Sequence, residues 1–439
     1  MVFFSKRIGL AIAAMLGCLI AGAGVAFADG AAKVDSGDTA WVLASAALVM
    51  LMTPGLGLFY AGMVRRKNVL ATILQSFIMV GVIGVLWVLY GYSLAFGKDH
   101  WGIIGSLDWI GLRGVGLEPY PAYSATIPHQ AFMIYQCMFA VITPALITGA
   151  FAERMRFKAF MIFMVLWATV VYDPVAHWVW APGGWLRELG ALDFAGGTVV
   201  HICSGVAALC CAVVLGRRKG YGREELKPHN LTMTLIGTAL LWFGWFGFNA
   251  GSALGANGLA VSAFVVTNTA AAAAAVVWVL IEWWHRGEPT ALGAASGAVA
   301  GLVAITPASG FVGPMAALAI GAVVSLVCYG AIMLKSKLGY DDSLDVFGVH
   351  GVGGTWGAIA TGLFASVAIN SAGANGLFNG SAALLGKQFI AIAAVAAYSF
   401  IVTFILLKLT GLITPLRVSK DDEDAGLDLS QHGESGYIF

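Results

Sequence analysis

Long apolar stretches recur along almost the whole of this 439-residue chain. A helix of about 20 mostly apolar residues is long enough to cross the hydrocarbon core of a membrane. Hydrophobic residues make up 59% of the sequence and charged residues only 11%, whereas soluble domains carry roughly 25% charged residues. Intrinsic disorder is excluded, because disordered chains are poor in apolar residues and this chain is rich in them. A net charge of +1 gives no electrostatic footprint for binding nucleic acid. The sequence therefore predicts an all-α polytopic membrane protein.

We expect eleven transmembrane helices. They are placed at residues 39–63, 69–96, 128–151, 159–181, 196–215, 231–252, 259–284, 291–307, 313–334, 346–368 and 387–411. The eighth is short and rich in small residues. Each span is expected to be a continuous helix, because a backbone amide without a partner is too costly in lipid. The alternating segments of about ten residues that build a membrane β-barrel do not occur.

The first 28 residues have the pattern of a secretory signal peptide. Lys6 and Arg7 precede a long apolar run, which closes with an Ala-x-Ala ending at Ala28. This pattern predicts cleavage after Ala28; the alternative is an uncleaved first helix, because the apolar run is long for a signal. The rest of the chain is then divided into a membrane domain and a C-terminal tail, at residues 29–414 and 415–439.

Positively charged residues are distributed unevenly between the two sides of the predicted helices. If the mature N-terminus lies outside, the inner loops contain Arg65, Arg66, Lys67, Arg154, Arg156, Lys158, Arg217, Arg218, Lys219, Arg223, Lys227, Arg286, Lys335 and Lys337. The outer segments contain only Lys33, Lys98, Arg113, Arg187 and Lys387. Because lysine and arginine concentrate in cytoplasmic loops, the N-terminus is predicted outside and the C-terminus in the cytoplasm. A cleaved signal peptide would place the N-terminus on the same side.

The first and sixth predicted helices contain similar motifs. Residues 55–62 read GLGLFYAG and residues 244–251 read GWFGFNAG, with four of eight positions identical. Helices that are five spans apart run in opposite directions, and inverted repeats are a transporter architecture with the pathway at the repeat interface. The pattern predicts a 5+5 inverted repeat, with halves at 39–215 and 231–368 and a last helix at 387–411. A chance match is the alternative.

Three ionisable side chains lie near the middle of predicted spans: Asp173, His201 and His350. An ionised group at the bilayer centre costs about 3 kcal/mol or more, so such residues point to function. The two histidines lie on the fifth and tenth helices, again five apart, and small residues such as Gly205 and Gly354 lie three or four positions from them. Small residues allow helices to approach closely, which would bring both imidazoles to the pseudo-twofold axis. The alternative is that each histidine only hydrogen-bonds a neighbour within the core.

A metal held by the histidines would make the protein a membrane enzyme. Zinc normally takes three or four protein ligands, and no third ligand with suitable spacing lies near either histidine. The six cysteines form no CxxC pair, and the segment HGVGGTWG at residues 350–357 is apolar on both sides, unlike a dinucleotide-binding turn between a strand and an amphipathic helix. We therefore expect no metal, no cofactor and no enzymatic activity.

Three motifs and the tail resemble the ammonium transporter family, relatives of the Rhesus proteins. The motifs are DFAGGTVVH at residues 193–201, GWFGFNAGS at 244–252 and DVFGVHGVGG at 345–354. The resemblance covers nearly all of the chain after residue 38 and implies transport of ammonium or ammonia, with methylammonium as an analogue. It also implies eleven helices in a 5+5 inverted repeat, a homotrimer with one pathway per subunit, and a place in the lipid of the cell (inner) membrane.

By this resemblance, His201 and His350 match the family's two pore histidines. Two neutral imidazoles that share a hydrogen bond could accept from or donate to a small N–H species in an apolar tube. An ammonium ion would lose its hydration there at a prohibitive cost in free energy. The resemblance therefore implies that the ion loses a proton first and passes as ammonia. Whether a proton follows along the histidines stays open.

The resemblance also assigns residues at the outer mouth. Phe139 and Phe248 match a stacked aromatic pair that gates it, with Tyr135 one helical turn before Phe139. Trp180 and Ser252 match the outer recruitment site, where a tryptophan face attracts a cation by a contact worth about 2 kcal/mol when desolvated and a hydroxyl accepts an N–H bond. The presence of both Trp180 and Ser252 is typical of the ammonium-transporter branch of the family rather than the Rhesus branch. From the residues alone, Trp180 is an interfacial belt tryptophan and the phenylalanines are packing.

Two acidic residues lie near the outer ends of spans. Asp193 directly precedes the segment that opens the fifth helix, so it is predicted to cap that helix. The resemblance implies that Asp193 organises the recruitment site rather than binding the cation. No family role maps onto Asp173, for which we expect a local hydrogen bond near the outer end of the fourth helix.

The tail contains an acidic run at residues 421–424, which by composition is typical of a solvated arm. The resemblance implies instead a folded tail that contacts neighbouring subunits, and a docking surface for a PII-type nitrogen signalling protein. The residues that match the family's regulatory tail are Arg417, Glu423, Gly426, Asp428, His432 and Glu434.

Three other functions stay open beside an ammonium transporter. One is an ammonium sensor that signals through its tail, the second is the metal-dependent membrane enzyme, and the third is a urea or water channel. The channel class needs neither a cation-collecting tryptophan nor a pore with two histidines.

Overall fold

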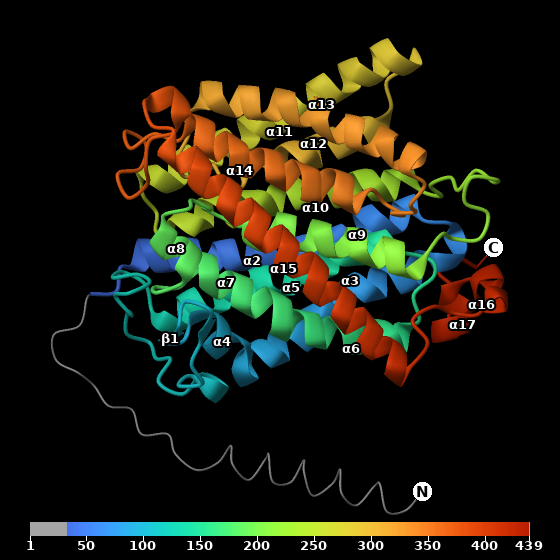
Figure 1. Cartoon of the computed structure of the whole chain (residues 1–439), viewed down its shortest axis with the longest axis horizontal. Helices are drawn as coiled ribbons and strands as arrows, with labels where there is room; N and C mark the ends of the chain where they lie inside the picture. Colours follow the sequence, from blue (N-terminus) through green and yellow to red (C-terminus); the bar gives the residue numbers. More distant parts are fainter. Residues whose placement is uncertain (1–32, 439) are drawn as a thin grey trace, which may run out of the picture.

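The structure, a computed structural model, describes residues 33–438 of the chain (Figure 1). The signal peptide predicted at residues 1–28 lies outside these residues. Within them, nine helices are long and apolar enough to cross a membrane, several of them built from consecutive helical segments. They are Ser36–Met63 (α2), Arg66–Phe96 (η1, α3, η2 and α4), His129–Phe151 (α5 and η4), Phe157–Leu189 (α6, η5, α7 and α8), Gly197–Leu215 (η6 and α9), Leu231–Ala253 (α10 and η7), Gly258–Arg286 (α11), Pro314–Leu338 (α13) and Ala383–Ile413 (α15).

Two shorter helical stretches occupy the remaining predicted spans. α12 covers Ala291–Ile305 and is the span that the sequence marked as short. η8 (Phe347–Gly351) and α14 (Val352–Phe364) form the other, which ends at residue 364 rather than 368. The segments within the long helices are η1 (Arg66–Asn68), α3 (Val69–Leu86), α4 (Tyr92–Phe96), α5 (His129–Ile147), η4 (Thr148–Phe151), α6 (Phe157–Trp167), α7 (Asp173–Trp180), α8 (Trp185–Leu189), α9 (Cys203–Leu215), α10 (Leu231–Ala250) and η7 (Gly251–Ala253).

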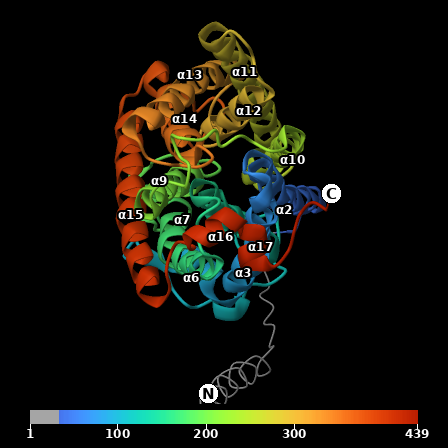
Figure 2. The ribbon, with the colours of Figure 1, turned by 90° about the vertical axis from the view of Figure 1, so that its right-hand side faces the viewer.

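The helices run side by side between two ends of the molecule (Figure 1). At one end, which we call the sheet end, β1 (Asp99–His100) and β2 (Ile104–Gly105) form an antiparallel ribbon beside α8. This ribbon departs from the prediction of a wholly helical chain. At the opposite end, which we call the tail end, α16 (Lys420–Ala425) and α17 (Leu427–His432) lie across the bundle (Figure 2). The linking segments also hold η3 (Ile110–Leu112) and η9 (Leu377–Asn379).

Large apolar side chains are exposed along the outside of the bundle. Val85, Val261, Leu326 and Ile401, on four different helices, are exposed by 60%, 65%, 58% and 57%. Soluble monomers rarely expose extended apolar surface, whereas in a membrane such side chains lie among lipid tails. The exterior and the length of the helices make this chain a multi-pass membrane protein.

Four of the helical rods depart from α-helical geometry over a short segment, while the helix itself continues through that segment. Each contains a π-helical segment: η2 (Trp87–Gly91), η5 (Ala168–Tyr172), η6 (Gly197–Ile202) and η8. A π-segment keeps its backbone hydrogen bonds inside the helix, so it meets the requirement for paired amides in lipid. Such segments occur often at functional sites, and η6 and η8 carry the two histidines.

The two helices with similar motifs, α2 and α10, pack along each other. A Cβ atom on Gly62 would lie 2.4 Å from the carbonyl oxygen of Asn230, and one on Gly247 would lie 2.8 Å from the carbonyl oxygen of Ser45. Small residues at these positions allow the two backbones to touch, as in other membrane helix pairs. The motif glycines are therefore packing residues at the centre of the molecule.

Candidate functional site

His201 and His350 meet in the interior of the bundle. His201 lies in η6 and His350 in η8, and the two residues are exposed by only 1% and 3%. Their Nδ1 atoms are 3.2 Å apart, and their ring centroids are 5.3 Å apart with an interplanar angle of 27°. At this distance one ring donates its Nδ1–H to the bare Nδ1 of the other. Two residues that the sequence expects on a common axis are thus in contact.

The histidine backbones approach closely because glycines lie where the segments cross. A Cβ atom on Gly205 would lie 2.2 Å from the backbone nitrogen of Gly351, and one on Gly354 would lie 2.9 Å from Cβ of His201. The packing is reciprocal, since α9, which follows His201, contacts η8, and α14, which follows His350, contacts η6. Glycine packing therefore sets the distance between the two imidazoles.

We expect Gly205→Ala to lose transport activity together with stability. The added methyl group would overlap the backbone of Gly351, and overpacking of this kind typically costs about 1–3 kcal/mol. Thermal unfolding and methylammonium uptake of the purified, reconstituted variant would measure both effects. Gly81→Ala is the matched control, because a Cβ atom on Gly81 meets nothing within 4 Å. Equal behaviour of the two variants would contradict the importance of the close crossing.

A narrow cavity lies beside the histidine pair, and we call it the histidine cavity. Its volume is about 10 Å³, near the lower limit for a single water molecule. Trp245 stacks on His201, with ring centroids 5.4 Å apart, and Nε2 of His201 has no hydrogen-bond partner within residues 33–438. The lining residues are Met52, Leu56, Ile142, Leu146, Val200, His201, Leu241, Trp245, Phe248, Val299 and His350. The cavity is therefore apolar, with imidazole nitrogens as its main hydrogen-bonding groups.

Phe139 and Phe248 separate the histidine cavity from a second pocket. Phe248 lines the histidine cavity and Phe139 lines the other pocket, and their ring centroids are 4.4 Å apart. The two rings are tilted by 44° and are not stacked, contrary to what the resemblance implies. Both side chains are almost fully buried. The two rings therefore lie in contact between the two spaces.

The second pocket, which we call the aromatic pocket, has a volume of about 180 Å³, and its lining includes Arg187 of α8, the helix beside the ribbon at the sheet end. Trp180 and Ser252, which the resemblance assigns to one recruitment site, both line this pocket. The indole N–H of Trp180 donates to the carbonyl oxygen of Asp193 at 3.0 Å, which fixes the ring. The full lining is Phe96, Ala122, Tyr123, Phe132, Gln136, Phe139, Trp180, Arg187, Phe194, Ser252 and Leu254.

Tyr135 is buried and does not line this pocket. Its hydroxyl lies 2.9 Å and 2.8 Å from the carbonyl oxygens of Gly247 and Phe248 and 3.1 Å from the hydroxyl of Ser252. Ser252 in turn donates to the carbonyl oxygen of Phe248 at 2.9 Å. Tyr135 therefore holds the end of α10, which carries Phe248, together with η7, which carries Ser252.

Asp193 receives the first amides of the fifth span, in agreement with the predicted cap. Its carboxylate accepts hydrogen bonds from the backbone nitrogens of Gly196, Gly197 and Thr198 at 2.8, 2.6 and 2.7 Å, and from the Thr198 hydroxyl at 2.5 Å. These bonds occupy the carboxylate. Asp193 thereby anchors both the start of η6 and, through its carbonyl oxygen, the ring of Trp180.

Asp173 does not make the predicted local hydrogen bond. Its side chain is buried, 3% exposed, at the start of α7 directly after η5. No hydrogen bond to its carboxylate occurs among residues 33–438. The structure thus separates Asp173 from the histidine cavity and from the aromatic pocket, neither of which it lines.

Three residues at the site escape the sequence analysis. Trp245 precedes Phe248 by three residues, so helical spacing could have placed both on one face. Gln136 lines the aromatic pocket, and its Oε1 atom is buried without a partner among the described residues. Arg187 also lines this pocket, although the sequence presents it only as a positive charge outside the spans.

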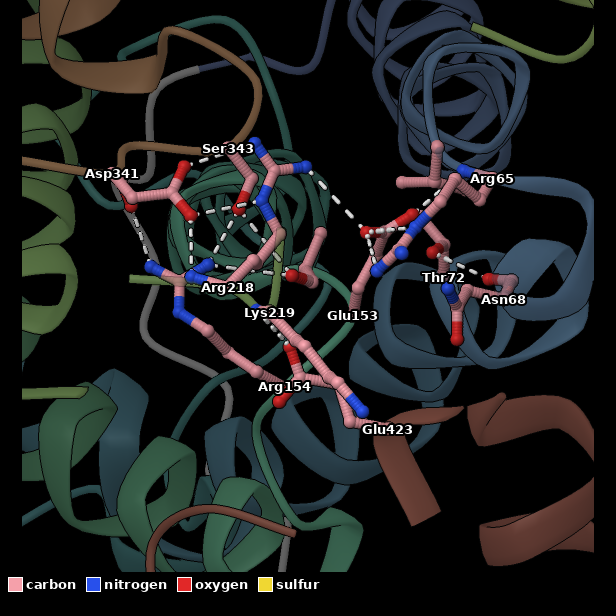
Figure 3. Close-up of polar contacts among 12 residues, drawn as sticks. Arg65, Asn68, Thr72, Glu153, Arg154, Arg218, Lys219, Asp341, Ser343 and Glu423 are labelled. Carbon is pink, nitrogen blue, oxygen red and sulfur yellow. Dashed lines mark hydrogen bonds and ion pairs between the residues drawn. The ribbon is translucent and has the colours of Figure 1, made fainter. Parts of the chain in front are cut away.

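A buried network of charges lies at the tail end (Figure 3). Glu153 is 2% exposed and accepts hydrogen bonds from the backbone nitrogen and Nε of Arg65, at 2.7 and 2.9 Å. Arg218 lies 3.6 Å from Glu153 and binds the carboxylate of Asp341 through two bonds of 2.9 Å. Arg154 donates to the carbonyl oxygen of Asp341 at 2.5 Å. The network ties together four loops that connect different helices.

The tail continues this network. The carboxylate of Glu423 accepts from the backbone nitrogen of Lys219 and from Nη2 of Arg417, both at 2.6 Å. Arg417 also donates to the carbonyl oxygen of Arg217 at 2.7 Å. Glu423 is 2% exposed, so the acidic run is not simply a solvated arm.

Asp428 and Gly426 dock the tail onto the start of α3. Asp428 accepts from the backbone nitrogens of Leu70 and Ala71, at 3.0 and 2.8 Å. Gly426 has a φ angle of 94°, and a Cβ atom there would lie 2.5 Å from the carbonyl oxygen of Lys67. Only glycine therefore fits this position without strain.

The last two predicted tail residues contribute less. The ring of His432 packs edge-on against Phe157, with centroids 4.9 Å apart. Glu434 is exposed, and its backbone nitrogen donates to the carbonyl oxygen of Asp428 at 3.1 Å. The tail thus folds against loops of its own chain, and the contact with neighbouring subunits stays a prediction.

Comparison with known proteins shows which family has this sequence pattern and architecture. A model of the Ammonium Transporter Family matches residues 40–437. The ammonium transporter of Bacillus subtilis (strain 168) is 58% identical over 405 residues, which are 92% of this chain and 99% of that protein.

Solved structures agree with the sequence match. The crystal structure of Candida albicans Mep2 aligns with a TM-score of 0.85 at 37% identity, covering 92% of this chain and 94% of that one. A structure described as a sensor Amt protein aligns with a TM-score of 0.83 at 29% identity, covering 90% and 98%.

Proposed function

Because this chain belongs to the ammonium transporter family, we propose that it collects ammonium in the aromatic pocket and conducts it as ammonia past the histidine pair. The chain is an ammonium transporter by its family and by the names of its relatives. The route and the chemistry of passage are the proposal. The observation that carries it is the contact of two buried imidazoles beside a cavity that is otherwise apolar.

The histidine cavity favours a neutral molecule. A bare cation in an apolar cavity would lose its hydration without compensation, which costs many kcal/mol. A neutral ammonia molecule needs only hydrogen-bond partners, and the imidazole nitrogens supply them. Nε2 of His201 is free for this purpose among the described residues. In an electroneutral cycle, the proton that ammonium gives up leaves before or at the phenylalanine pair. In an electrogenic cycle, that proton instead follows along the imidazoles.

The aromatic pocket favours a cation. Trp180 offers an aromatic surface, Ser252 a hydroxyl and Gln136 a carbonyl oxygen that has no partner within residues 33–438. A cation over an aromatic face gains about 0.5–2 kcal/mol, depending on its desolvation. Phe139 lines the inner wall of this pocket and contacts Trp180, with centroids 5.7 Å apart. We assign recruitment to Trp180 and Ser252, gating to Phe139 and Phe248, and support of both to Tyr135 and Asp193.

The placement in the membrane is part of the same proposal. All eleven predicted spans cross the membrane as a 5+5 inverted repeat and a last helix, with the sheet end outside and the tail end in the cytoplasm. Three copies assemble into a homotrimer in the cell (inner) membrane, each with its own pathway. The reciprocal packing of α9 on η8 and of α14 on η6 supports the repeat.

The tail is proposed to regulate transport from the cytoplasmic side. Arg417, Glu423, Gly426, Asp428 and His432 hold it against loops between membrane helices. A PII-type protein docking there would compete with or reinforce these contacts.

Recording uptake and current together in proteoliposomes tests the proposal. We expect the purified protein to move methylammonium, and the charge moved per molecule distinguishes ammonia passage from passage with a proton. No uptake, together with loss of cellular ammonium signalling on deletion of residues 415–439, would establish a sensor instead. Faster movement of water or urea than of methylammonium would establish another channel.

Replacement of Trp180 by leucine is expected to raise the KM for methylammonium by about tenfold with little change in the maximal rate. The substitution removes a cation–π contact worth about 0.5–2 kcal/mol while it leaves the histidine cavity intact. Uptake measured over a range of methylammonium concentrations gives both constants. Replacement of Trp284, which is 88% exposed and remote from the pocket lining, is the control. A fall in maximal rate at unchanged KM would contradict a recruitment role.

A further inference from the structure

Among residues 33–438, one charged side chain lines the aromatic pocket, and it is positive. Arg187 lies in α8, is exposed to solvent, and joins ten uncharged residues in lining the pocket. Its guanidinium donates a hydrogen bond to the carbonyl oxygen of Trp180. A fixed positive charge is unexpected in a space that collects a positive ion.

The acidic side chains near Arg187 in the fold are engaged elsewhere. Glu188, its neighbour in α8, accepts from the backbone nitrogen of Gly183 at 3.3 Å. Asp99 lies 2.9 Å from Nε2 of His177 and forms an ion pair with it when that ring is protonated. Arg187 forms no ion pair with a carboxylate among residues 33–438.

The charge of Arg187 acts across the pocket. Burial raises the pKa of the Tyr123 phenol, and the positive guanidinium of Arg187 opposes that rise. Tyr123 also lines the pocket. A group that stabilises a negative charge on one wall repels a positive charge in the space between.

We propose that Arg187 sets the ammonium affinity of the aromatic pocket by electrostatic repulsion, so that it is an affinity-determining residue for transport. The proposal rests on the proposed function, because it requires that the pocket binds the cation. Trp180 and Ser252 attract ammonium, and Arg187 weakens that attraction by a fixed amount. The pathway beyond the phenylalanine pair carries a neutral molecule and is unaffected. Arg187 therefore changes KM and not the maximal rate.

A second role for Arg187 would be mechanical, because its hydrogen bond braces the carbonyl oxygen of Trp180. The two roles predict different behaviour on substitution. Lysine keeps the charge but loses the planar, multi-donor geometry of the guanidinium, whereas glutamine loses the charge. If charge is the agent, Arg187→Lys resembles the wild type and Arg187→Gln does not. If bracing is the agent, both variants are impaired.

Methylammonium uptake into proteoliposomes at two ionic strengths tests the proposal. At about 0.01 M salt we expect Arg187→Gln to lower KM by about three- to tenfold, the range that Coulomb's law gives for unit charges roughly 6 Å apart at a high effective dielectric constant. At about 1 M salt the Debye length falls to about 3 Å. The ratio of the wild-type KM to the Arg187→Gln KM should therefore fall towards one. Arg187→Glu should lower KM further at low salt.

Arg113→Gln is the matched control, since Arg113 is exposed and does not line the pocket. It removes the same charge and should leave KM unchanged. The proposal is overturned if Arg187→Gln leaves KM unchanged or raises it at low salt, or if Arg187→Lys behaves like Arg187→Gln. Wild-type protein that moves no methylammonium would overturn the proposed function and this proposal together, whereas normal wild-type uptake with an unresponsive KM would overturn only this proposal.

Discussion

Replacing His201 and His350 together by alanine is expected to lower methylammonium uptake by about 10- to 100-fold. The substitution removes the two imidazoles that lie beside the otherwise apolar cavity. A transported molecule then lacks hydrogen-bond partners in that cavity, and each unmade bond costs about 1–3 kcal/mol. A small apolar cavity also stays dry, so water would not replace the lost groups. Uptake of methylammonium into proteoliposomes measures the effect.

His285→Ala is the control for this double variant. His285 is exposed at the end of α11, where it hydrogen-bonds the hydroxyl of Tyr329 at 2.7 Å, and it does not line the histidine cavity. Its loss should leave uptake unchanged. If the double variant keeps both the rate and the selectivity of the wild type, the imidazoles are not the path of the substrate and the proposed chemistry is wrong.

The second large effect is expected for Glu153→Gln, which should destabilise the folded protein by about 3 kcal/mol. Glu153 is almost fully buried between Arg65 and Arg218. Removing its charge leaves two arginines without this partner, and breaking a buried pair in this way typically costs about 3–5 kcal/mol. We expect the lower end, because Arg218 keeps Asp341 and Arg65 is partly exposed. Thermal unfolding of the detergent-purified protein would show the loss.

The loss of stability caused by Glu153→Gln is expected to depend on pH. Burial raises the pKa of Glu153, but the hydrogen bond from Arg65 and the charges of Arg218 and Arg65 outweigh burial and hold the pKa below its usual value. The pairs therefore stabilise the folded protein above about pH 4.3, the ordinary value for glutamate. This stabilisation is lost as the pH falls through the lower pKa of the folded state. The difference in unfolding midpoint between wild type and Glu153→Gln should be full at neutral pH and should close in acid.

Glu225→Gln provides the comparison, since Glu225 forms its pair with Lys227 on the surface, where both side chains are exposed by more than three quarters. Exposed pairs contribute about 0–1 kcal/mol. An equal effect of the two substitutions would mean that the buried network adds nothing beyond an ordinary surface contact.

The helical architecture was predictable because lipid imposes it. Apolar segments of sufficient length must become helices in a membrane, and the predicted spans coincide with helical segments to within a few residues. The π-segments could not be predicted, because they depend on how a turn packs against its neighbours. The ribbon of β1 and β2 depends similarly on contacts within one short linking segment.

The site was predictable where a residue type is rare in its surroundings. His201 and His350 are exceptional within apolar spans, so their position alone marks them. Phe139 and Phe248 are ordinary residues in such a chain, and only the resemblance of the motifs singles them out. Arg187 offered no signal, because an arginine in a loop is commonplace until its side chain is placed in a pocket.

The sequence by itself determined that this chain is a multi-pass membrane protein of a particular transporter family, since the length and the motifs of its apolar segments are local properties. The tertiary structure alone decided that two imidazoles 149 residues apart in the chain lie 3.2 Å from each other. It also decided that the phenylalanine rings are tilted, that the tail binds loops of its own chain, and that Arg187 lines the aromatic pocket. These features arise from packing between distant segments, such as Gly205 against Gly351, and the free energy of such contacts is set by neighbours that no local pattern specifies.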